Sequence, residues 1–119
     1  MSIVIYHHPR CSKSRKTLEL IKERGIEPKI VEYLQQPLDA AQLKQLAGLL
    51  GVPLADLLRK SESEFAEATD LPSLSDDDAL ANWLQQHPIV LQRPIVVDQS
   101  AGKAIVGRPP ENVTELLQK

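Results

Sequence analysis

Apolar residues alternate between short continuous runs and helix-spaced stripes along this chain. Residues 3–6 form a continuous run that is typical of a buried strand. Leu18 and Ile21 then share one face of a helix that we expect over 12–25, and 29–33 is expected to form a second strand. A strand, a helix and a strand of these lengths predict a parallel pair of strands joined by a right-handed crossover.

The middle of the chain is predicted to be helical. After a helix start at Asp39, apolar residues recur at i, i+3, i+4 and i+7, namely Leu43, Leu46, Ala47 and Leu50. A short helix is expected over 53–58. Ser75 and Asp78 resemble a capping box that opens a further helix. The apolar stripe of that helix is Leu80, Trp83 and Leu84. These stripes indicate an ordinary hydrophobic core.

Two strands and a helix are expected to close the chain. The runs 94–97 and 104–106 are separated by the polar, glycine-containing segment 98–103, which predicts an antiparallel hairpin. Pro109 and Pro110 then open a last helix, because proline is favoured in the first helical turn. Its apolar residues are Val113, Leu116 and Leu117.

The order of these elements predicts an α/β protein with a thioredoxin-like fold. Its four-stranded mixed sheet would be flanked by helices, with a helical insertion at about 38–88 between a β-α-β half and a β-β-α half. The chain contains no internal repeat, low-complexity segment or linker that would indicate a second domain. We therefore expect residues 1–119 to form a single domain.

Composition and charge narrow the classes of function. The 119 residues carry a formal net charge of -2, and no block of basic residues favours a nucleic acid as partner. No apolar stretch approaches the ~20 residues that span a bilayer, and no signal-peptide pattern precedes the first strand. We therefore expect a soluble, cytoplasmic monomer without nucleic-acid or membrane partners.

Cys11, the single cysteine, lies where the first strand turns into the first helix. A lone cysteine is commonly a small buried apolar residue. Here, however, a helix N-terminus offers unsatisfied N–H groups and the positive end of its dipole. Basic residues also surround the thiol, namely His7, His8, Arg10, Lys13 and Arg15. These features favour the thiolate, so Cys11 is a candidate nucleophile. One cysteine cannot form an internal disulfide, so a redox cycle would need an external thiol.

Three arginines stand at the edges of predicted elements, namely Arg59, Arg93 and Arg108. A single arginine is commonly a solvated surface residue, and spacing alone assigns these three no role. In a thioredoxin-like fold, however, Arg93 and Arg108 could both approach the Cys11 loop. Arginine forks suit the oxygens of a tetrahedral oxyanion, so an anion site at the thiolate is plausible.

Four separated blocks of sequence carry a resemblance to a known family. They are Ile-Tyr-His-His-Pro-Arg-Cys-Ser-Lys-Ser-Arg-Lys-Thr-Leu at 5–18, Leu-Leu-Arg-Lys at 57–60, His-Pro-Ile and Arg-Pro-Ile-Val-Val within 87–97, and Gly-Arg-Pro at 107–109. In this order they resemble the glutaredoxin-coupled arsenate reductases of bacteria (ArsC-like), over residues 3–117. The family typically has Asn and Gly-Thr where this chain has His8 and Ser12-Lys13.

The resemblance implies roles for individual residues. Cys11 would be the thiolate that attacks arsenate, and His7 would help to hold it ionised. The implied substrate-binding residues are Ser14, Arg15, Arg59, Arg93 and Arg108. A cis peptide bond is implied before Pro94. We expect a structural role for His87 and no metal site, because the histidines and Cys11 lack the spacing of metal ligands.

The resemblance also implies a reaction with external thiols. Attack on As(V) would give a cysteine–arsenate adduct, glutathione would add to it, and glutaredoxin would complete the reduction before arsenite leaves. Glutathione would thus be a co-substrate, no cofactor would be bound, and the partners would be glutaredoxin, glutathione and arsenate or a similar oxyanion.

Two other functions stay open. One is a monothiol oxidoreductase that acts through Cys11 on another oxyanion or on a glutathionylated substrate. The other is an Spx-like regulator that binds RNA polymerase. Such regulators typically carry Cys-x-x-Cys as a redox switch, whereas this chain has Ser14 in the second position, which disfavours that role.

Overall fold

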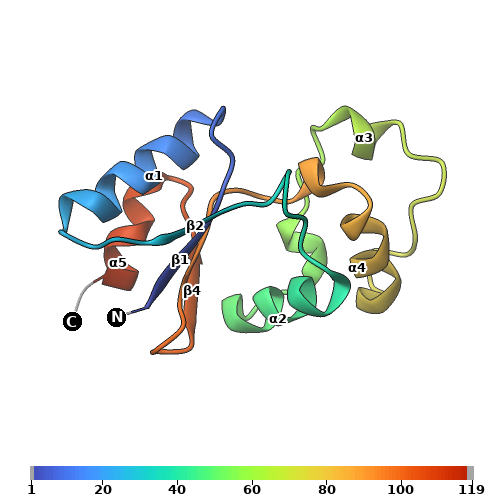
Figure 1. The fold of residues 1–119 in the computed structure, drawn as a ribbon. Coiled ribbons are helices and arrows are strands. Elements are labelled where there is room, and N and C mark those ends of the chain that lie inside the picture. The colour runs from blue at the N-terminus through green and yellow to red at the C-terminus, as the bar shows by residue number, and fades with distance from the viewer. Residues whose placement is uncertain (1, 118–119) are drawn as a thin grey trace. The chain divides into compact units, whose positions relative to one another are not determined.

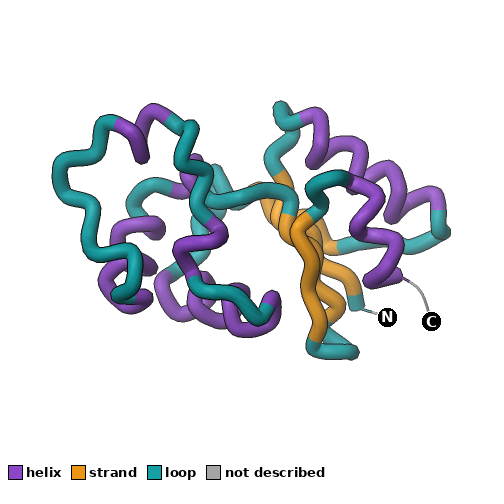
Figure 2. The backbone as a smooth tube through the Cα atoms, turned by 180° about the vertical axis from the view of Figure 1, so that it is seen from behind, coloured by secondary structure: helices purple, strands orange, loops and turns teal. Residues whose placement is uncertain are grey.

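The computed structural model describes residues 2–117, and its chain divides into two units. The first unit comprises Met1–Gln36 and Arg93–Lys119, and the second comprises Pro37–Gln92. The second unit contains helices and no strand among its described residues (Figures 1 and 2). The expected insertion at about 38–88 falls within it, and the single-domain organisation stays a prediction.

A four-stranded sheet forms the centre of the first unit. Its strands are β1 (Ile3–His7), β2 (Lys29–Glu32), β3 (Ile95–Asp98) and β4 (Lys103–Val106), in the order β2-β1-β3-β4. β1 pairs in parallel with β2 and antiparallel with β3, and β3 pairs antiparallel with β4. The predicted mixed sheet, with its parallel β-α-β unit and its β-β-α hairpin, is therefore confirmed.

Helices α1 (Ser12–Glu23) and α5 (Val113–Leu117) lie together on one face of this sheet (Figure 1). The buried core beneath them consists of Ile3, Ile5, Ile21, Val96, Val113, Leu116 and Leu117. Burying one such side chain contributes ~1.5–3 kcal/mol, so this core holds α1 firmly against β1. The loop between β1 and α1, which contains Cys11, is thereby anchored at both ends.

A polar turn closes the β3–β4 hairpin. The carboxylate of Asp98 accepts hydrogen bonds from the Ser100 hydroxyl (2.6 Å), the Ser100 N–H (3.1 Å) and the Ala101 N–H (3.3 Å). Gly102 has a φ of +64°, a conformation that other residues rarely adopt. The turn chemistry of the predicted segment 98–103 is therefore what reverses the chain.

The second unit is built from short helices. They are α2 (Ala40–Leu50), a 3-10 helix at Leu54–Leu57, α3 (Ser63–Ala66), α4 (Asp77–Gln85) and a 3-10 helix at Pro88–Val90. The predicted start of α2 at Asp39 is confirmed, because Asp39 and Gln42 form a reciprocal capping box. The sequence pattern predicted no counterpart of α3, and the long loop that follows α3 is evident in Figure 2.

The predicted capping box at Ser75 and Asp78 is wrong. The Asp76 carboxylate accepts the hydrogen bond from the Ala79 N–H (3.1 Å), and α4 begins one residue later than expected. Ser75 instead pairs its hydroxyl with that of Ser73 at 2.9 Å. Aspartate caps a helix as well as serine does, so three consecutive aspartates left the register of the cap ambiguous.

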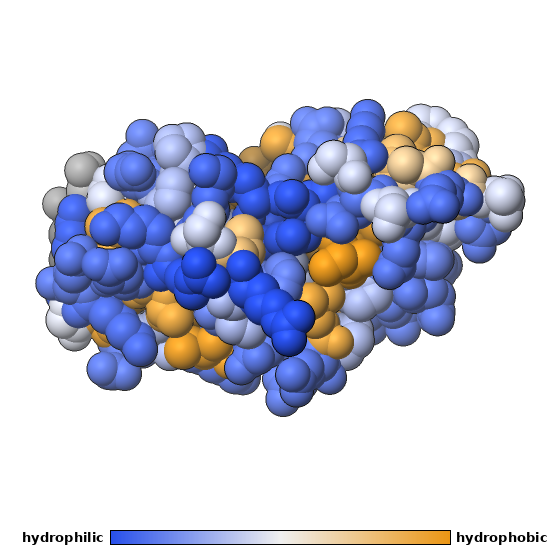
Figure 3. Space-filling model, turned by 90° about the horizontal axis from the view of Figure 1, so that it is seen from above, coloured by the Kyte–Doolittle hydropathy of each residue, from blue (hydrophilic) through white to orange (hydrophobic). Residues whose placement is uncertain are grey.

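The face of the protein seen in Figure 3 is mainly hydrophilic. On the face seen from above, hydrophobic side chains gather only in small separate patches (Figure 3). Among the described residues, Ile30 on β2 is the large apolar side chain that stands out, with 41 % of its surface exposed. No helix within residues 2–117 combines the length and the apolar character that a membrane span requires.

Candidate functional site

Cys11 occupies the N-cap of α1. Its backbone is extended, with φ of -90° and ψ of 121°, and α1 begins at the next residue. The Cys11 N–H donates to the His8 carbonyl at 3.0 Å, and the Cys11 carbonyl accepts from the Arg15 N–H at 3.0 Å. The half-buried thiol is therefore held at the point where the strand-to-helix turn ends, as the sequence predicted.

The first turn of α1 presents backbone N–H groups next to the thiol. No acidic residue lies in this turn, and no capping hydrogen bond of standard geometry forms to the Cys11 side chain. The N–H groups of the first turn have no carbonyl partner within the helix, so they favour a negative charge on the sulfur.

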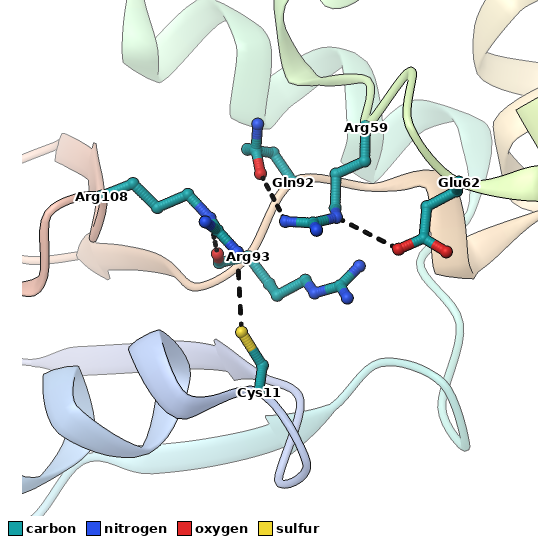
Figure 4. A network of polar contacts seen from close by, with 6 residues as sticks. All are labelled: Cys11, Arg59, Glu62, Gln92, Arg93 and Arg108. Atoms are coloured by element: carbon teal, nitrogen blue, oxygen red, sulfur yellow. Dashed lines mark hydrogen bonds and ion pairs between the residues drawn. The ribbon is translucent and has the colours of Figure 1, made fainter.

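Two arginines from the other end of the chain lie at the same thiol (Figure 4). The Arg108 Nη2 atom lies 3.6 Å from Cys11 Sγ, and its Nε donates to the Arg93 carbonyl at 2.8 Å. The Arg93 side chain is itself 7 % exposed. The first unit thus brings Cys11, Arg93 and Arg108 together, although these residues lie far apart in the sequence.

These groups lower the pKa of the Cys11 thiol. Burial raises this pKa, but the Ser14 N–H, the Arg93 guanidinium, the Lys13 N–H and the charge of Arg108 together outweigh burial. The thiolate is therefore favoured relative to an ordinary cysteine. A thiolate is the reactive form of cysteine, so the site can perform nucleophilic attack.

Arg93 and Arg108 both precede a cis proline. The peptide bond between Arg93 and Pro94 is cis, which confirms the expectation from the family resemblance. The bond between Arg108 and Pro109 is also cis, and the sequence analysis did not anticipate it. Asn112 donates from its side-chain amide to the Arg108 carbonyl at 3.0 Å, which fixes the backbone that carries this arginine.

His7 contacts the loop through Ser14. The His7 Nδ1 atom lies 2.7 Å from the Ser14 hydroxyl, and the His8 N–H donates to the same hydroxyl at 3.1 Å. Burial lowers the pKa of His7 and Glu32 partly opposes this, while the positive charges of Arg15 and Lys22 lower it further, as does His8. The neutral form of His7 is therefore favoured, and its expected catalytic role stays a prediction.

Ser14 and Arg15 both brace the loop. The Ser14 hydroxyl is fully buried and hydrogen-bonded to His7 and His8. Ser14 therefore contacts the thiol through its backbone N–H. The Arg15 Nη1 atom donates to the Pro9 carbonyl at 3.2 Å and is exposed. Substrate binding by either residue stays a prediction.

Arg59 belongs to the second unit. Its Nε donates to the Glu62 carboxylate at 3.3 Å and its Nη1 donates to the Gln92 side-chain carbonyl at 3.3 Å. Its backbone N–H donates to the Val90 carbonyl at 2.6 Å. The orientation of this guanidinium is therefore set within its own unit, and its expected role in substrate binding stays a prediction.

His87 makes structural contacts, as predicted. Its ring stacks on Trp83 with a centroid distance of 4.2 Å, and its Nδ1 lies 2.9 Å from a Glu64 carboxylate oxygen. Within residues 2–117, the structure holds no cluster of three or more histidine, cysteine, aspartate or glutamate side chains that could bind a metal ion.

Several residues of these networks had no predicted role. Glu62 stands three positions after Arg59, a spacing at which an ion pair could have been found, whereas Gln92 lies 33 positions away. Thr17 and Gly107 also had no predicted role. Their contact depends on the close approach of α1 to the end of β4, which no local pattern in the sequence contains.

Comparisons with known proteins agree with this arrangement. A model of the ArsC family matches residues 6–116. The uncharacterised protein YfgD of Escherichia coli is 46 % identical over 97 % of this chain and 96 % of its own. An arsenate reductase of Neisseria meningitidis is 44 % identical, over 97 % of both chains. The solved structure of an arsenate reductase from Vibrio cholerae is 42 % identical over 97 % of both chains, with a TM-score of 0.88. This chain therefore belongs to the ArsC family.

Proposed function

We propose that this protein is an arsenate reductase that uses Cys11 as its nucleophile and external thiols as its reductant. Relatives of nearly the same length are named arsenate reductases, which supports this substrate. The observation that carries the proposal is the contact of 3.6 Å between Arg108 and Cys11 at the N-terminus of α1. A reactive thiolate beside arginine forks suits a substrate that is a tetrahedral oxyanion.

The first step forms a bond between sulfur and arsenic. The Cys11 thiolate attacks As(V), and one arsenate oxygen leaves as water after it takes up protons. The guanidinium groups of Arg93 and Arg108 stabilise the charge on the remaining oxygens. The N–H groups of the first turn of α1 stabilise the thiolate before attack and the bound anion after it.

The later steps transfer two electrons. Glutathione displaces a second oxygen, as water, to give an arsenic centre that is bound to both Cys11 and glutathione. A glutaredoxin thiolate then attacks the glutathione sulfur and forms a mixed disulfide, so the electron pair of the broken S–As bond reduces As(V) to As(III). Water finally releases arsenite and returns the Cys11 thiol.

The external reductant is proposed because the chain has a single cysteine. A cysteine–arsenic adduct needs a second thiol for its reduction, and no other residue of this chain provides one. Glutathione is accordingly proposed as co-substrate and glutaredoxin as partner, without a bound cofactor. We also propose that the protein acts as a monomer in the cytoplasm.

A coupled assay tests this function. Arsenate-dependent oxidation of NADPH would be followed with glutathione, glutaredoxin and glutathione reductase, for the wild type and for Cys11→Ser. We expect turnover in the wild type and none in the variant. Omitting glutaredoxin or glutathione in turn should also abolish turnover if the proposed route is correct.

The negative outcome is equally informative. If the wild type shows no arsenate turnover while Cys11 still reacts as a low-pKa thiol, the assignment to arsenate is wrong. The same assay with a glutathionylated peptide in place of arsenate would then test a monothiol oxidoreductase, a function that the lowered pKa of Cys11 also favours.

A further inference from the structure

We propose that Gly107 is a positioning residue, because its missing side chain allows the end of β4 to approach α1 closely and so sets Arg108 against Cys11. The effect of Gly107 on arsenate turnover rests on the proposed function. Its effect on the reactivity of the Cys11 thiol does not depend on that function.

The surroundings of Gly107 leave no space for a side chain. A Cβ atom at this position would lie 2.6 Å from the Thr17 hydroxyl oxygen, 3.1 Å from the Thr17 methyl group and 2.8 Å from the Pro94 Cγ atom. Distances below about 3 Å are well inside van der Waals contact, so at least one of these groups would have to move. Gly107 is the glycine of the first unit that combines burial with such contacts among the described residues.

Neither neighbour can move away cheaply. Thr17 is fully buried, and its hydroxyl donates to the Lys13 carbonyl at 2.8 Å, in the first turns of α1. Pro94 is buried, and its carbonyl accepts the Gly107 N–H at 2.9 Å. A rotation of Thr17 would break its hydrogen bond, and the proline ring can displace its Cγ atom only by a change of pucker.

The strain must therefore move the backbone on one side of the site. If α1 shifts, the N-terminal turn that carries Cys11 shifts with it. If the end of β4 shifts, the next residue, Arg108, moves instead. Either shift lengthens the separation of 3.6 Å between Arg108 Nη2 and Cys11 Sγ, and a shift of the end of β4 also strains the bond of 2.8 Å from Arg108 Nε to the Arg93 carbonyl.

A set of variants tests this role. In Gly107→Ala, we expect alkylation of Cys11 by neutral iodoacetamide near pH 7 to slow by about threefold or more, because less thiolate is present. The full pH profile of alkylation should shift upward. Thr17→Ala removes two of the three close contacts. Adding Gly107→Ala to the Thr17→Ala variant should therefore slow alkylation less than adding Gly107→Ala to the wild type does.

Arg108→Gln separates positioning of the arginine from a general disturbance of the helix. If Gly107 acts through Arg108, then adding Gly107→Ala to Arg108→Gln should change the alkylation profile little further. Gly48→Ala is the matched control, because a Cβ atom added at Gly48 would meet no atom within 4 Å and Gly48 lies in the second unit. It should leave both alkylation and arsenate turnover unchanged.

Two results would overturn the role of Gly107. One is a folded Gly107→Ala protein with an unchanged alkylation profile. The other is a shift of that profile by Gly107→Ala that is as large in the Arg108→Gln variant as in the wild type. If Gly107→Ala alone does not fold, the double variant with Thr17→Ala, which retains the contact of 2.8 Å with Pro94, replaces it. A raised KM for arsenate should accompany the slower alkylation. Absent wild-type turnover would contradict only the proposed substrate, because alkylation would still be measured.

Discussion

The Nδ1 atom of His7 lies 2.7 Å from the hydroxyl oxygen of Ser14, and both side chains are buried. This contact joins the last residue of β1 to the first turn of α1 across the loop that ends at Cys11. Because the Ser14 N–H lowers the pKa of Cys11, a fixed Ser14 also fixes one of the groups that favour the thiolate. Through the Ser14 hydroxyl, His7 thus holds a residue whose N–H lies at the thiol.

Ser14→Ala should destabilise the protein. The substitution leaves the buried Nδ1 atom of His7 and the N–H of His8 without the hydroxyl that they now contact. A buried polar group that loses its partner costs about 1–3 kcal/mol, so the free energy of unfolding should fall by that amount. Urea denaturation of the two proteins, followed by circular dichroism, measures this difference.

Ser61→Ala is the control for this substitution, because Ser61 is an exposed serine in a turn. It should change the free energy of unfolding by less than about 0.5 kcal/mol. An equally small effect of Ser14→Ala would mean that water or a rearranged loop satisfies His7 and His8, and the bridge would then not stabilise the loop.

Stability should fall in mild acid through His7. Burial lowers the pKa of His7, with Glu32 opposing it. The unfolded chain then binds a proton at a higher pH than the folded protein does. The stabilisation is therefore complete above the ordinary histidine pKa of ~6.5 and is lost as pH falls below that value toward the folded pKa.

His7→Asn tests this linkage, because asparagine does not titrate and its amide can reach toward the position of Nδ1. The free energy of unfolding would be measured about one pH unit above and one below the ordinary histidine pKa of ~6.5. The wild type should lose more stability across this interval than His7→Asn does. Equal losses in the two proteins would assign the acid sensitivity to other groups.

The cap of α4 offers a direct comparison of two adjacent positions. Asp76→Ala should lower the free energy of unfolding by about 1 kcal/mol, because it removes the acceptor of the Ala79 N–H. Ser75→Ala should have a much smaller effect, because the Ser75 hydroxyl pairs with Ser73 on an exposed loop. Thermal unfolding of the two variants measures this difference, and the reverse order would restore the cap that the sequence pattern predicted.

Elements defined by local pattern were predictable from the sequence. The apolar run before Cys11, the stripe on α1 and the hairpin turn each depend on neighbouring residues, and all appear in the structure. The register of the α4 cap was not predictable, because Asp76 and Ser75 are nearly equivalent as caps and tertiary context decided between them. The same holds for α3, a single helical turn at Ser63–Ala66 without an apolar stripe.

The candidate site was predictable only in part. Cys11 could be identified from its place between a strand and a helix, Arg93 and Arg108 from the predicted fold, and Arg59 from the family resemblance. The contact between Arg108 and Cys11 joins positions 97 residues apart, so no local pattern contains it. The close packing of Gly107 on Thr17 likewise depends on how α1 lies against the end of β4.

Arg59→Ala should weaken the binding of arsenate and leave the reactivity of the Cys11 thiol unchanged. Arg59→Ala removes a guanidinium that Glu62 and Gln92 orient. If Arg59 binds the oxyanion, the KM for arsenate should rise roughly tenfold, as expected for loss of ~1.4 kcal/mol of binding. The alkylation profile of Cys11 should stay as in the wild type. A variant that unfolds more easily while keeping the wild-type KM would limit Arg59 to a structural role.

Two substitutions of Arg93 separate the effect of its charge from the effect of the shape of its guanidinium. Burial raises the pKa of Cys11, and the Arg93 guanidinium is one of the groups that reverse this effect. Arg93→Met removes the charge but keeps much of the apolar stem, so the pKa of Cys11 should rise and alkylation near pH 7 should slow. Arg93→Lys keeps the charge and should alkylate at a rate closer to that of the wild type.

The two variants should nevertheless share a defect toward arsenate. Lysine presents one ammonium group, whereas arginine presents a planar fork that can donate two hydrogen bonds to one oxyanion. Both variants should therefore show a raised KM for arsenate in the coupled assay, although only Arg93→Met should show slow alkylation. If Arg93→Lys retained the wild-type KM, Arg93 would act on the substrate through its charge alone, and the fork geometry would carry no part of oxyanion recognition.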